Sequence, residues 1–561
     1  MIKAPKPPFV CFQCRLIRPP KRPRLLRNPT TASLLFSSSR RYNSTTNGKT
    51  ATSIDPDSAN PPIQSRPPTA PKPNIDIKHI RQNPALYAQN CRERNYKAQA
   101  EYPALISDLF EQWQASQRSA RSLRERGNAL RRQITNPATI QHEDDETGSK
   151  PKSTSTSPSS PPPASDAAAD KDIKAMSKKQ LIDEARAVKS RLSGIEEEEA
   201  RLEARMQDLA LAVPNLTSAE TPRGTEPRVL AFVNDHPEPE PSSSDRVWRS
   251  HVHVGSELGI LDFAAAAASS GWGWYYLVDE GARLEQALVA YALAAVTRRR
   301  DAGWRLVSPP SVVYSHIGAA CGFQPRDRSG ETQVYALQGH RGKPELSLAG
   351  TAEIPLAAMK ADAVLEASDL PLKHVAVSRC YRAEAGARGV DTKGLYRVHE
   401  FTKVEMFAWT APSEAAAAEV FDEVLDLQTE ILQGLGLHCR VLEMPSADLG
   451  ASAFRKCDIE AFFPSRRDPD PDREGARDGW GEVTSASVCT DFQARRLATR
   501  LRAPDRMAYP WTVNGTALAV PRVLAAILEN GWDEADMSVV IPEVLRPWMG
   551  GEERIGLKHR R

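Results

Sequence analysis

Two neighbouring segments of this 561-residue chain combine side chains that could hold a flat, charged ligand. In the segment CYRAE, Arg382 and Glu384 stand two residues apart, which places them on one face of an extended strand. The residues predicted to share the polar face of the second segment are Arg397, His399, Phe401, Lys403 and Glu405. A solvated strand face would also be polar. It would not explain an aromatic ring between arginine and glutamate side chains opposite an Arg-x-Glu pair, so the combination predicts a binding site.

Four further segments complete this constellation of polar residues. LAGTAEIPL and GEVTSASVCTDFQARR carry hydroxyl and carboxylate side chains, and VNGTALAVPRVLAAILEN reads as a glycine-containing strand that leads into a helix. In GWRLVSPPSVV, Pro310 follows an amphipathic helix predicted over Leu284 to Arg300. The candidate site residues in the first three segments are Thr351, Glu353, Glu482, Ser485 and Arg522.

Taken together, these segments resemble the three signature motifs of class II aminoacyl-tRNA synthetases, and TAE, FTKVE and DFQARR resemble the seryl-tRNA synthetases in particular. Several motifs in the right order are far more specific than one. The resemblance extends from Ile75 to Gly551. It implies an α+β fold: an antiparallel sheet flanked by helices, preceded by an antiparallel helical coiled-coil arm. It implies a homodimer through the region of Pro310.

The resemblance also implies a serine–tRNA ligase reaction with ATP and Mg²⁺. The serine carboxylate would attack the α-phosphorus of ATP to give seryl-adenylate and pyrophosphate, and serine would then pass to tRNA(Ser). Such an attack requires cations that neutralise charge on the phosphate oxygens, and it requires in-line positioning. By resemblance, Arg382 would bind the α-phosphate, and Arg397 and Arg522 the terminal phosphate. Arg382 and Arg522 would therefore be the catalytic residues.

The remaining assignments by resemblance divide the site in two. Glu384 would accept the adenine amino group, Phe401 would stack on the adenine ring, and Val398 would belong to the same ATP site; Glu482 and Ser485 would hold Mg²⁺ and the nucleotide. The residues implied to bind serine are Thr351, Glu353, Arg382, Glu405, Asn514 and Thr516. Such a pocket would reject alanine, because its buried polar groups would be left unpaired. The third motif departs from bacterial relatives at Ala517 and Pro521, which are glycines there.

Length and composition bound the class of protein. A chain of 561 residues suggests two or three domains. Hydrophobic residues make up 40% and charged residues 26%, as in soluble proteins, and no apolar run approaches the roughly 20 residues that a membrane span needs. We therefore expect no membrane association. The net charge of +3 is nearly neutral, so any nucleic acid would be bound by local patches.

The first 54 residues contain no Asp or Glu but many Arg and Lys, with a run of serines at 37–39. This composition predicts a mitochondrial transit peptide and a location in the mitochondrial matrix. A disordered basic tail that contacts nucleic acid is the alternative. Cys11 and Cys14 form a CxxC pair, but no second pair follows at zinc spacing, and the scattered cysteines fit reduced thiols.

Two long runs between the N-terminal region and the motifs predict paired helices. Apolar residues recur at alternating steps of four and three from Leu109 to Ile134 and again from Leu181 to Leu209, the spacing of a coiled-coil seam. Ser177 and Gln180 form a predicted capping box at the start of the second helix. The first helix carries a row of arginines that could contact tRNA phosphates, although a solvated face would look the same. They are Arg118, Arg121, Arg124, Arg126, Arg131 and Arg132.

The predicted domains follow from these patterns. They are a transit peptide (1–54), a Pro-rich linker (55–74), a tRNA-binding helical hairpin arm (75–213) with a disordered insertion (138–170), a class II catalytic domain (214–551) and a basic C-terminal tail (552–561). The acidic loop at 466–479 could suggest a calcium site, but its prolines and Arg473 favour a solvated loop. His251 and His253 would share a strand face, and without a third ligand packing is favoured over metal binding.

Two other classes of protein share parts of this pattern. A catalytically inactive synthetase-like RNA-binding protein would be expected to lose the arginines of the ATP site or the serine pocket, and these residues are present. A ligase that charges a carrier protein would be expected to lack a long arm. Both remain alternatives to the synthetase at this stage.

Overall fold

The structure, a computed structural model, describes residues 67, 70–135, 173, 176–235, 249–298, 303–323, 333–339, 343–383, 394–468 and 478–556. The predicted transit peptide, the insertion at 138–170, the middle of the acidic loop and Glu384 lie outside these residues. Within them, no helix has both the length and the apolar character that crossing a membrane would require.

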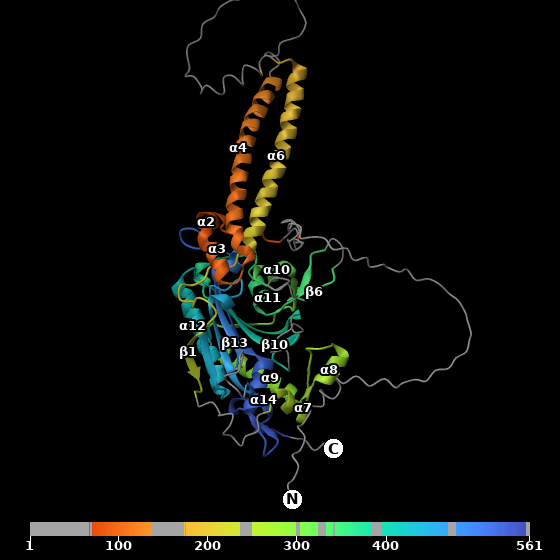
Figure 1. The fold of residues 1–561 in the computed structure, drawn as a ribbon, viewed down its shortest axis with the longest axis vertical. Coiled ribbons are helices and arrows are strands. Elements are labelled where there is room, and N and C mark those ends of the chain that lie inside the picture. The colour runs from red at the N-terminus through yellow and green to blue at the C-terminus, as the bar shows by residue number, and fades with distance from the viewer. Residues whose placement is uncertain are drawn as a thin grey trace, which may run out of the picture. The chain divides into compact units, whose positions relative to one another are not determined.

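The helices and strands alternate along the chain without a simple repeat (Figure 1). The α-helices are α2 (Ile77–Gln82), α3 (Pro84–Glu93), α4 (Tyr102–Thr135), α6 (Lys178–Ala212), α7 (His251–Glu257), α8 (Phe263–Ser269), α9 (Glu280–Thr297), α10 (Ser315–Ala320), α11 (Glu353–Ala358), α12 (Glu414–Gly434), α13 (Phe492–Leu497) and α14 (Val520–Asn530). Short 3₁₀ helices lie at Ala98–Glu101, Ala367–Asp369, Ser446–Asp448 and Glu543–Met549.

The main sheet has eight strands in the order β1-β11-β12-β13-β16-β10-β9-β4. These are β1 (Arg228–Val233), β4 (Arg305–Val307), β9 (Leu372–Tyr381), β10 (Glu400–Thr410), β11 (Cys439–Glu443), β12 (Arg455–Arg467), β13 (Asp478–Thr490) and β16 (Trp511–Ala519). All neighbours are antiparallel except β4 and β9, which run parallel. The α+β fold with an antiparallel sheet is therefore confirmed.

Smaller sheets surround the main one. They are formed by β5 (Val312–Tyr314), β6 (Ala336–Leu337) and β7 (Leu346–Leu348); by β8 (Val364–Glu366), β14 (Arg500–Arg502) and β15 (Met507–Ala508); by β17 (Trp532–Asp533), β18 (Ser538–Val540) and β19 (Arg554–Gly556); and by β2 (Leu261–Asp262) and β3 (Tyr276–Leu277). Because β19 pairs with β18, the folded catalytic region extends to Gly556, into the segment that the sequence assigned to a basic tail.

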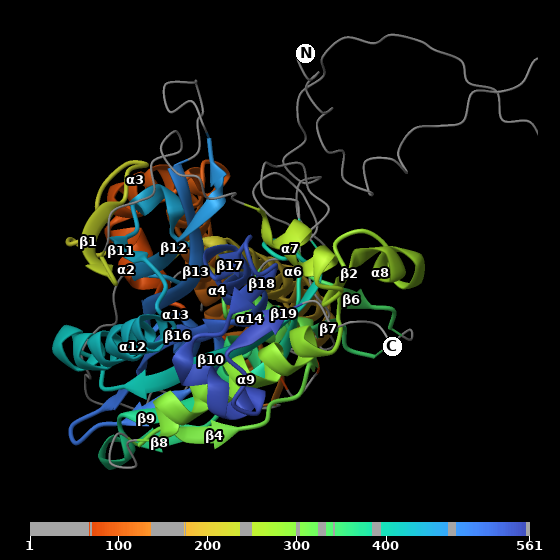
Figure 2. The same cartoon turned by 90° about the horizontal axis from the view of Figure 1, so that it is seen from below.

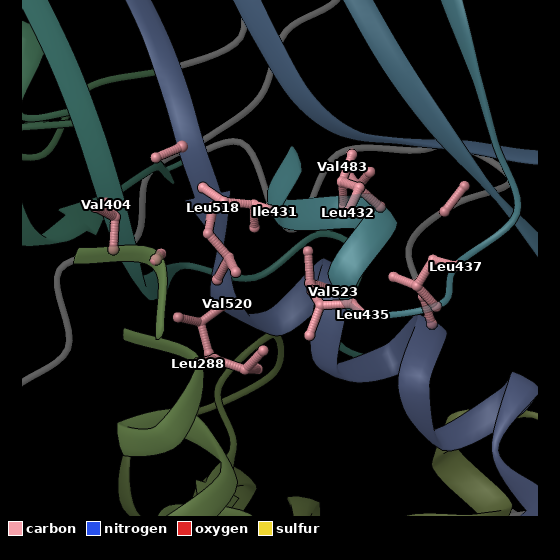
Figure 3. Close-up of a cluster of buried hydrophobic side chains, with 14 of the residues drawn as sticks. Leu288, Val404, Ile431, Leu432, Leu435, Leu437, Val483, Leu518, Val520 and Val523 are labelled. Carbon is pink, nitrogen blue, oxygen red and sulfur yellow. The ribbon is translucent and has the colours of Figure 1, made fainter. Parts of the chain in front are cut away.

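Strand β10 contributes to two hydrophobic cores and also to a polar site. Its even-numbered residues Val404 and Met406 are fully buried in a large core beneath α9, α12 and α14. Figure 2 shows these three helices lying across the sheet, and Figure 3 shows Val404 and Leu518 of the strands close to Leu288 and Val520 of the helices. On the opposite face, Phe407 and Trp409 belong to a second core with α10 and α11. The polar residues earlier on that second face are left to form a site.

The two long helices predicted before the catalytic region are α4 and α6, which lie side by side and together are called the arm here (Figure 1). Their buried contacts come from the predicted seam: Leu123 and Leu130 of α4 pack with Leu181 and Val188 of α6. The capping box of Ser177 and Gln180 is present, with both reciprocal hydrogen bonds formed. The seam also buries one charge, Glu199, which accepts a hydrogen bond of 2.7 Å from Gln117 Nε2.

The arm joins the catalytic region at a junction that contains buried arginines. The segments of the chain at this junction are called the arm base here: α2, α3, the first turns of α4 and the last turns of α6 with the residues to Leu216. Arg94 is fully buried and donates to the carbonyls of Asn215 at 2.6 Å and Leu216 at 3.3 Å, and also to Gly450. The side chain of Asn215 in turn donates to the carbonyls of Ser452 and Cys489, each at 2.9 Å. The side chains of Arg94 and Asn215 thus donate to backbone carbonyls of the catalytic region at this junction.

The prediction of a strand at His251 is wrong, because His251–Glu257 form α7. The carboxylate of Glu529 accepts hydrogen bonds from both the backbone N (3.0 Å) and Nδ1 (2.8 Å) of His251. The backbone N–H of Leu395 donates to Nε2 of His251 at 3.0 Å, so Nε2 is an acceptor and the ring proton lies on Nδ1. Both ring nitrogens are therefore occupied by protein contacts, as expected for packing and hydrogen bonding in place of metal binding.

Candidate active site

The central cavity lies where β13 and β16 separate. The two strands are paired from Ala486 and Gly515 to Thr490 and Thr512, and no pairs continue beyond Ala486 and Gly515. The side chain of Gln428 on α12 fills the fork, with Nε2 donating to the carbonyls of Ser485 (2.8 Å) and Thr516 (2.9 Å). Backbone groups freed from the ladder are thus satisfied without closing the gap.

This cavity has a volume of about 220 Å³ and is lined mainly by polar side chains. Eight of the residues predicted from the sequence line it together: Arg382, Arg397, Val398, Phe401, Glu482, Ser485, Thr516 and Arg522. They come from the β9–β10 hairpin, β13, β16 and the first turn of α14. Arg382 and Arg522 line the same cavity although they are 140 residues apart along the chain. The cavity therefore brings together side chains from motifs that are far apart in the sequence.

Arg382 is held by the hairpin just beyond the end of β9. Its backbone N–H donates to the carbonyl of His399 at 2.9 Å, and Nδ1 of His399 lies 2.9 Å from the carbonyl of Arg382. The guanidinium carbon of Arg382 lies 5.4 Å from the centre of the Phe401 ring. A cation and an aromatic ring are therefore adjacent at one end of the cavity, where an adenine ring could stack and a phosphate could pair.

Arg522 and Tyr396 form the other wall. The guanidinium carbon of Arg522 lies 4.7 Å from the centre of the Tyr396 ring, and that of Arg466 lies 4.1 Å from the same ring. Arg522 Nη1 contacts both the carbonyl and the Oε2 of Glu482 at 3.0 Å. Since Arg522 is in the first turn of α14, its charge adds to the positive end of the helix dipole. This wall is suited to an anion.

Glu482 carries the negative charge of the cavity. Burial alone would raise the pKa of Glu482, but the cations Arg522, Lys456 and Arg382 outweigh burial and hold this pKa down to about 2. Next to it, β12 places Lys456 and Asp458 in an ion pair of 2.7 Å. Burial, together with the charge of Glu482, raises the pKa of Asp458 to about 7 in spite of Lys456. The ionised carboxylate at neutral pH is therefore Glu482.

Beneath the cavity lies a second, buried group of predicted residues that do not line it: Thr351, Glu353, Glu405 and Asn514. Glu353 Oε1 accepts hydrogen bonds from Gln493 Nε2 (2.6 Å) and Asn514 Nδ2 (3.0 Å). Thr351 Oγ1 accepts from the backbone N–H of Glu353 at 3.4 Å. Burial raises the pKa of Glu353 to about 7, and the nearby charge of Glu405 acts in the same direction, against Lys403, Gln493 and Arg382.

Lys403 connects the two groups. It lines the cavity and forms an ion pair with Glu405, which is only 2% exposed. The hydroxyl of Thr516 donates to the same carboxylate at 3.1 Å and lies 3.3 Å from Nζ of Lys403. With Glu353 and Glu405 both ionised, one lysine leaves this pocket with a net negative charge. A small cation such as an ammonium group would compensate it.

The sequence reasoning did not assign roles to several residues that shape the site. The sequence predicts Lys403 on the polar face of its strand but without a partner, and it predicts no role for Tyr396, Gln493, Lys456 and Asp458. Gln493 is in the DFQARR segment, which was noted for its resemblance only. Alternation along β12 and β10 could have indicated that Lys456, Asp458 and Lys403 share the site face, whereas nothing local indicates that Gln493 reaches Glu353.

The main sheet is antiparallel with one parallel edge strand. Its cavity holds arginines, an aromatic ring and an ionised glutamate over a buried acidic pocket. Together these features define a class II aminoacyl-tRNA synthetase core. Residues 335–531 match the family of tRNA synthetase class II core domains (G, H, P, S and T). The chain is 41% identical over 374 residues to the mitochondrial serine–tRNA ligase of Saccharomyces cerevisiae, covering 66% of this chain and 78% of the yeast protein. It is 35% identical over 479 residues to the serine–tRNA ligase of Rubrobacter xylanophilus, covering 85% and 98% of the two chains.

Among solved structures, the seryl-tRNA synthetase of Pyrococcus horikoshii complexed with ATP matches with a TM-score of 0.68 and 29% identity. The match covers 86% of this chain and all of that one. The chain belongs to the seryl-tRNA synthetase family.

Proposed function

We propose that this chain activates L-serine with ATP and transfers the serine to tRNA(Ser) in mitochondria. The observation that carries the proposal is the fork between β13 and β16, where three arginines, Phe401 and ionised Glu482 line one cavity above a buried acidic pocket. An inactive RNA-binding relative would not need to keep this set. A ligase for carrier proteins would not need the arm, and the relatives that match are serine–tRNA ligases.

In the proposed first step, a carboxylate oxygen of serine forms a bond to the α-phosphorus of ATP. The bond from that phosphorus to the bridging oxygen breaks, and the electron pair leaves with pyrophosphate. Arg382 would neutralise charge on the α-phosphate, with the adenine ring on Phe401 beside it and Glu384 as the acceptor for the adenine amino group. Arg397 and Arg522, from different elements, would hold the terminal phosphate for in-line departure.

Mg²⁺ is normally bound through one or two carboxylates together with substrate phosphates. Glu482 fits this role because its pKa of about 2 keeps it ionised, and Ser485 lies on the same strand at the cavity wall. Among the described residues no cluster of three or more His, Cys, Asp or Glu side chains could hold a metal without substrate. Bound there, Mg²⁺ would neutralise part of the phosphate charge.

The buried pocket would take the amino acid. When Glu405 and Glu353 are both ionised, their two charges face the single ammonium of Lys403, while Arg382 acts more weakly on Glu353, and the negative charge that is left matches the serine ammonium. Thr351, Asn514 and Thr516 supply the hydroxyl and amide groups that could pair with the serine side chain. Alanine would leave these buried groups unpaired, which is the strongest form of discrimination available to a small pocket.

The test is serine-dependent ATP–pyrophosphate exchange by the purified chain without its first 54 residues. We expect exchange with serine, and exchange at least 100-fold weaker with alanine, since loss of a hydrogen-bonded group commonly costs about that much or more. Charging of tRNA(Ser) by the same preparation tests the second step. Absence of serine-dependent exchange from a folded, ATP-binding protein would overturn the proposal.

The arm is the proposed tRNA-binding element, and its helices have the spacing of a coiled coil. Of the six arginines on α4, three are paired with glutamates: Arg121 with Glu125, Arg124 with Glu196 and Glu199, and Arg126 with Glu184. For Arg118, Arg131 and Arg132, all exposed, no ion pair is found within the described residues. We propose that these three contact tRNA phosphates, whereas Arg124 and Arg126 mainly hold α4 to α6.

Two further parts of the proposal concern the oligomeric state and the cellular location. Leu306, Val312 and Tyr314 near Pro310 are 60%, 42% and 45% exposed, a grouping of apolar side chains that supports a homodimer through the first motif. The acid-free segment 1–54, together with the mitochondrial relative in yeast, supports import into the mitochondrial matrix.

A further inference from the structure

The short helix α13 touches the serine pocket with one residue and the arm base with the next turn. It follows directly after β13, and its six residues, Phe492–Leu497, end at Ala498, whose backbone is left-handed with a φ of 55°. Gln493 and Arg496 are three positions apart, one turn of the helix. A displacement of either end of this turn would therefore displace the other.

Gln493 fixes the carboxylate that would face serine. Its side chain is fully buried; Nε2 donates to Glu353 Oε1 at 2.6 Å, and its Oε1 accepts from the hydroxyl of Thr512 at 2.7 Å. With Asn514 donating to the same Oε1, one oxygen of Glu353 is saturated. Within the described residues no donor to Oε2 is found, which leaves that oxygen for a ligand.

Arg496 seats the same helix on the arm base. It is 5% exposed, and its Nη2 donates to the carbonyls of Leu211 and Val213 at the end of α6, each at 3.2 Å. Its guanidinium carbon lies 3.3 Å from the centre of the Phe492 ring. Burial lowers the pKa of Arg496 to about 9 in spite of Asp491. A cation at these carbonyls also complements the negative end of the α6 dipole.

A neighbouring residue adds a second tie to the arm base. The carbonyl of Arg495 accepts from the backbone N–H of Asn74 at 2.9 Å, just before α2, while its Nε pairs with Asp491 at 2.7 Å. The cavity of about 380 Å³ beside these contacts is lined by residues of α2, α6 and α13. Helix α13 therefore rests on both chain segments that enter the arm.

We propose that α13 couples the arm base to the serine pocket. Gln493 is a positioning residue that orients Glu353, and Arg496 is a positioning residue that holds α13 at the depth where Gln493 reaches Glu353. A shift of the arm base on tRNA binding would then change the affinity for serine through this helix. The inference rests on the proposed function, since it assumes that Glu353 faces serine.

The first test separates the two substrates. In pyrophosphate exchange, Gln493→Met should raise the KM for serine about 10- to 100-fold, the usual effect of losing a hydrogen bond to a charged group, with the KM for ATP unchanged. Because the hydrogen bond from Gln493 lowers the pKa of Glu353, its removal should also move the pH midpoint of the serine KM upward. Thr512→Val, which leaves the amide in place but unanchored, should have a smaller effect of the same kind.

The second test concerns the arm base. Arg496→Lys should raise the serine KM several-fold without changing the ATP KM, and combined with Gln493→Met it should add little, because the two residues act through one contact. Arg500→Met, at an exposed arginine on the adjacent β14, is the matched control and should leave both KM values unchanged.

The outcomes distinguish this inference from the proposed function. If the unmodified protein shows no serine-dependent exchange, the proposed function fails. If it does, equal KM changes for serine and ATP in Gln493→Met, an unmoved pH midpoint, or additive effects in the double variant would overturn the coupling through α13. Thermal unfolding of each variant shows that the comparison is made on folded protein, and Thr512→Val provides the same test should Gln493→Met fail to fold.

Discussion

The raised pKa of Glu353 makes serine binding dependent on pH in a direction that can be worked out. In the empty pocket, burial raises this pKa to about 7, helped by the charge of Glu405. A bound ammonium would stabilise the ionised form and lower the pKa. Serine therefore binds the ionised carboxylate more tightly, and its affinity is complete above the pKa of the empty pocket and is lost as the pH falls through it.

The magnitude follows from the ionised fraction. With a pKa of about 7, roughly nine-tenths of Glu353 is ionised at about pH 8 and roughly one-tenth at about pH 6. If only the ionised form binds, the KM for serine rises about tenfold between these two pH values. The serine ammonium stays protonated throughout, so the change belongs to the protein.

The assay is pyrophosphate exchange at saturating ATP with serine varied at each pH. The KM for ATP is measured in parallel, because the pKa of Asp458 is also raised to about 7 by burial and this residue lies on the nucleotide side; Asp458→Asn removes that titration. Glu353→Gln should bind serine weakly at every pH in the range, measured by thermal shift where exchange is too slow. A serine KM that stays within twofold between about pH 8 and pH 6 would refute the reasoning.

Four further predictions test other parts of the proposal. Arg382→Ala should lower exchange by on the order of 10²-fold or more without unfolding, whereas Arg379→Ala, on the same hairpin but paired with Glu285 and outside the cavity, should have little effect. Replacing residues 118–198 with a short Gly-Ser linker should spare exchange and abolish tRNA charging; full charging would show that the arm does not bind tRNA. Light scattering at micromolar concentration should give a dimer, and an active monomer would argue against the interface around Leu306. Fused to a fluorescent reporter, residues 1–54 should direct it to mitochondria, and a diffuse cytosolic signal would contradict the transit peptide.

The replaced segment, residues 118–198, is chosen so that the arm base stays intact. Gln117 and Glu199 lie level with each other, joined by a hydrogen bond, so a linker between them closes the hairpin without strain. Removal of the whole region from Ile75 to Ala212 would instead take away Arg94, which donates to the carbonyls of Asn215 and Gly450, and would leave Arg496 without the surroundings that bury it. Unpartnered buried cations are costly, and the catalytic region would be destabilised for a reason unrelated to tRNA.

Local sequence patterns were sufficient where the structure is itself local. Alternation in FTKVEMF predicted the two faces of β10, and the four-three spacing predicted the buried residues of α4 and α6. The capping box at Ser177 needs only residues three apart. The eight cavity residues were found through resemblance, since nothing in the spacing of Arg382 and Arg522 indicates that they face one space.

The errors and omissions share one cause, which is contact over long separations in the chain. The alternation HVHV favoured a strand, but Glu529, 278 residues away, accepts hydrogen bonds from the first turn at His251 and stabilises a helix there. The sequence does not distinguish the arginines of α4 from one another, but in the structure Glu184 and Glu196 of α6 form ion pairs with two of them. Pairing partners of this kind cannot be deduced from one helix.

Strand β10 and helix α13 each carry residues of the active site together with residues that pack elsewhere. On β10, one face changes from Lys403 and Glu405, which belong to the site, to Phe407 and Trp409, which belong to the core, so the packing of the aromatic residues fixes the height of the charged ones. On α13, Gln493 donates to Glu353 in the proposed serine pocket, and Arg496 donates to the arm base. In both elements a rigid repeat carries a binding residue and an anchoring residue together. The precision of the pocket is thus set by packing outside it, and substitutions at the anchors should change substrate affinity before they change the chemistry.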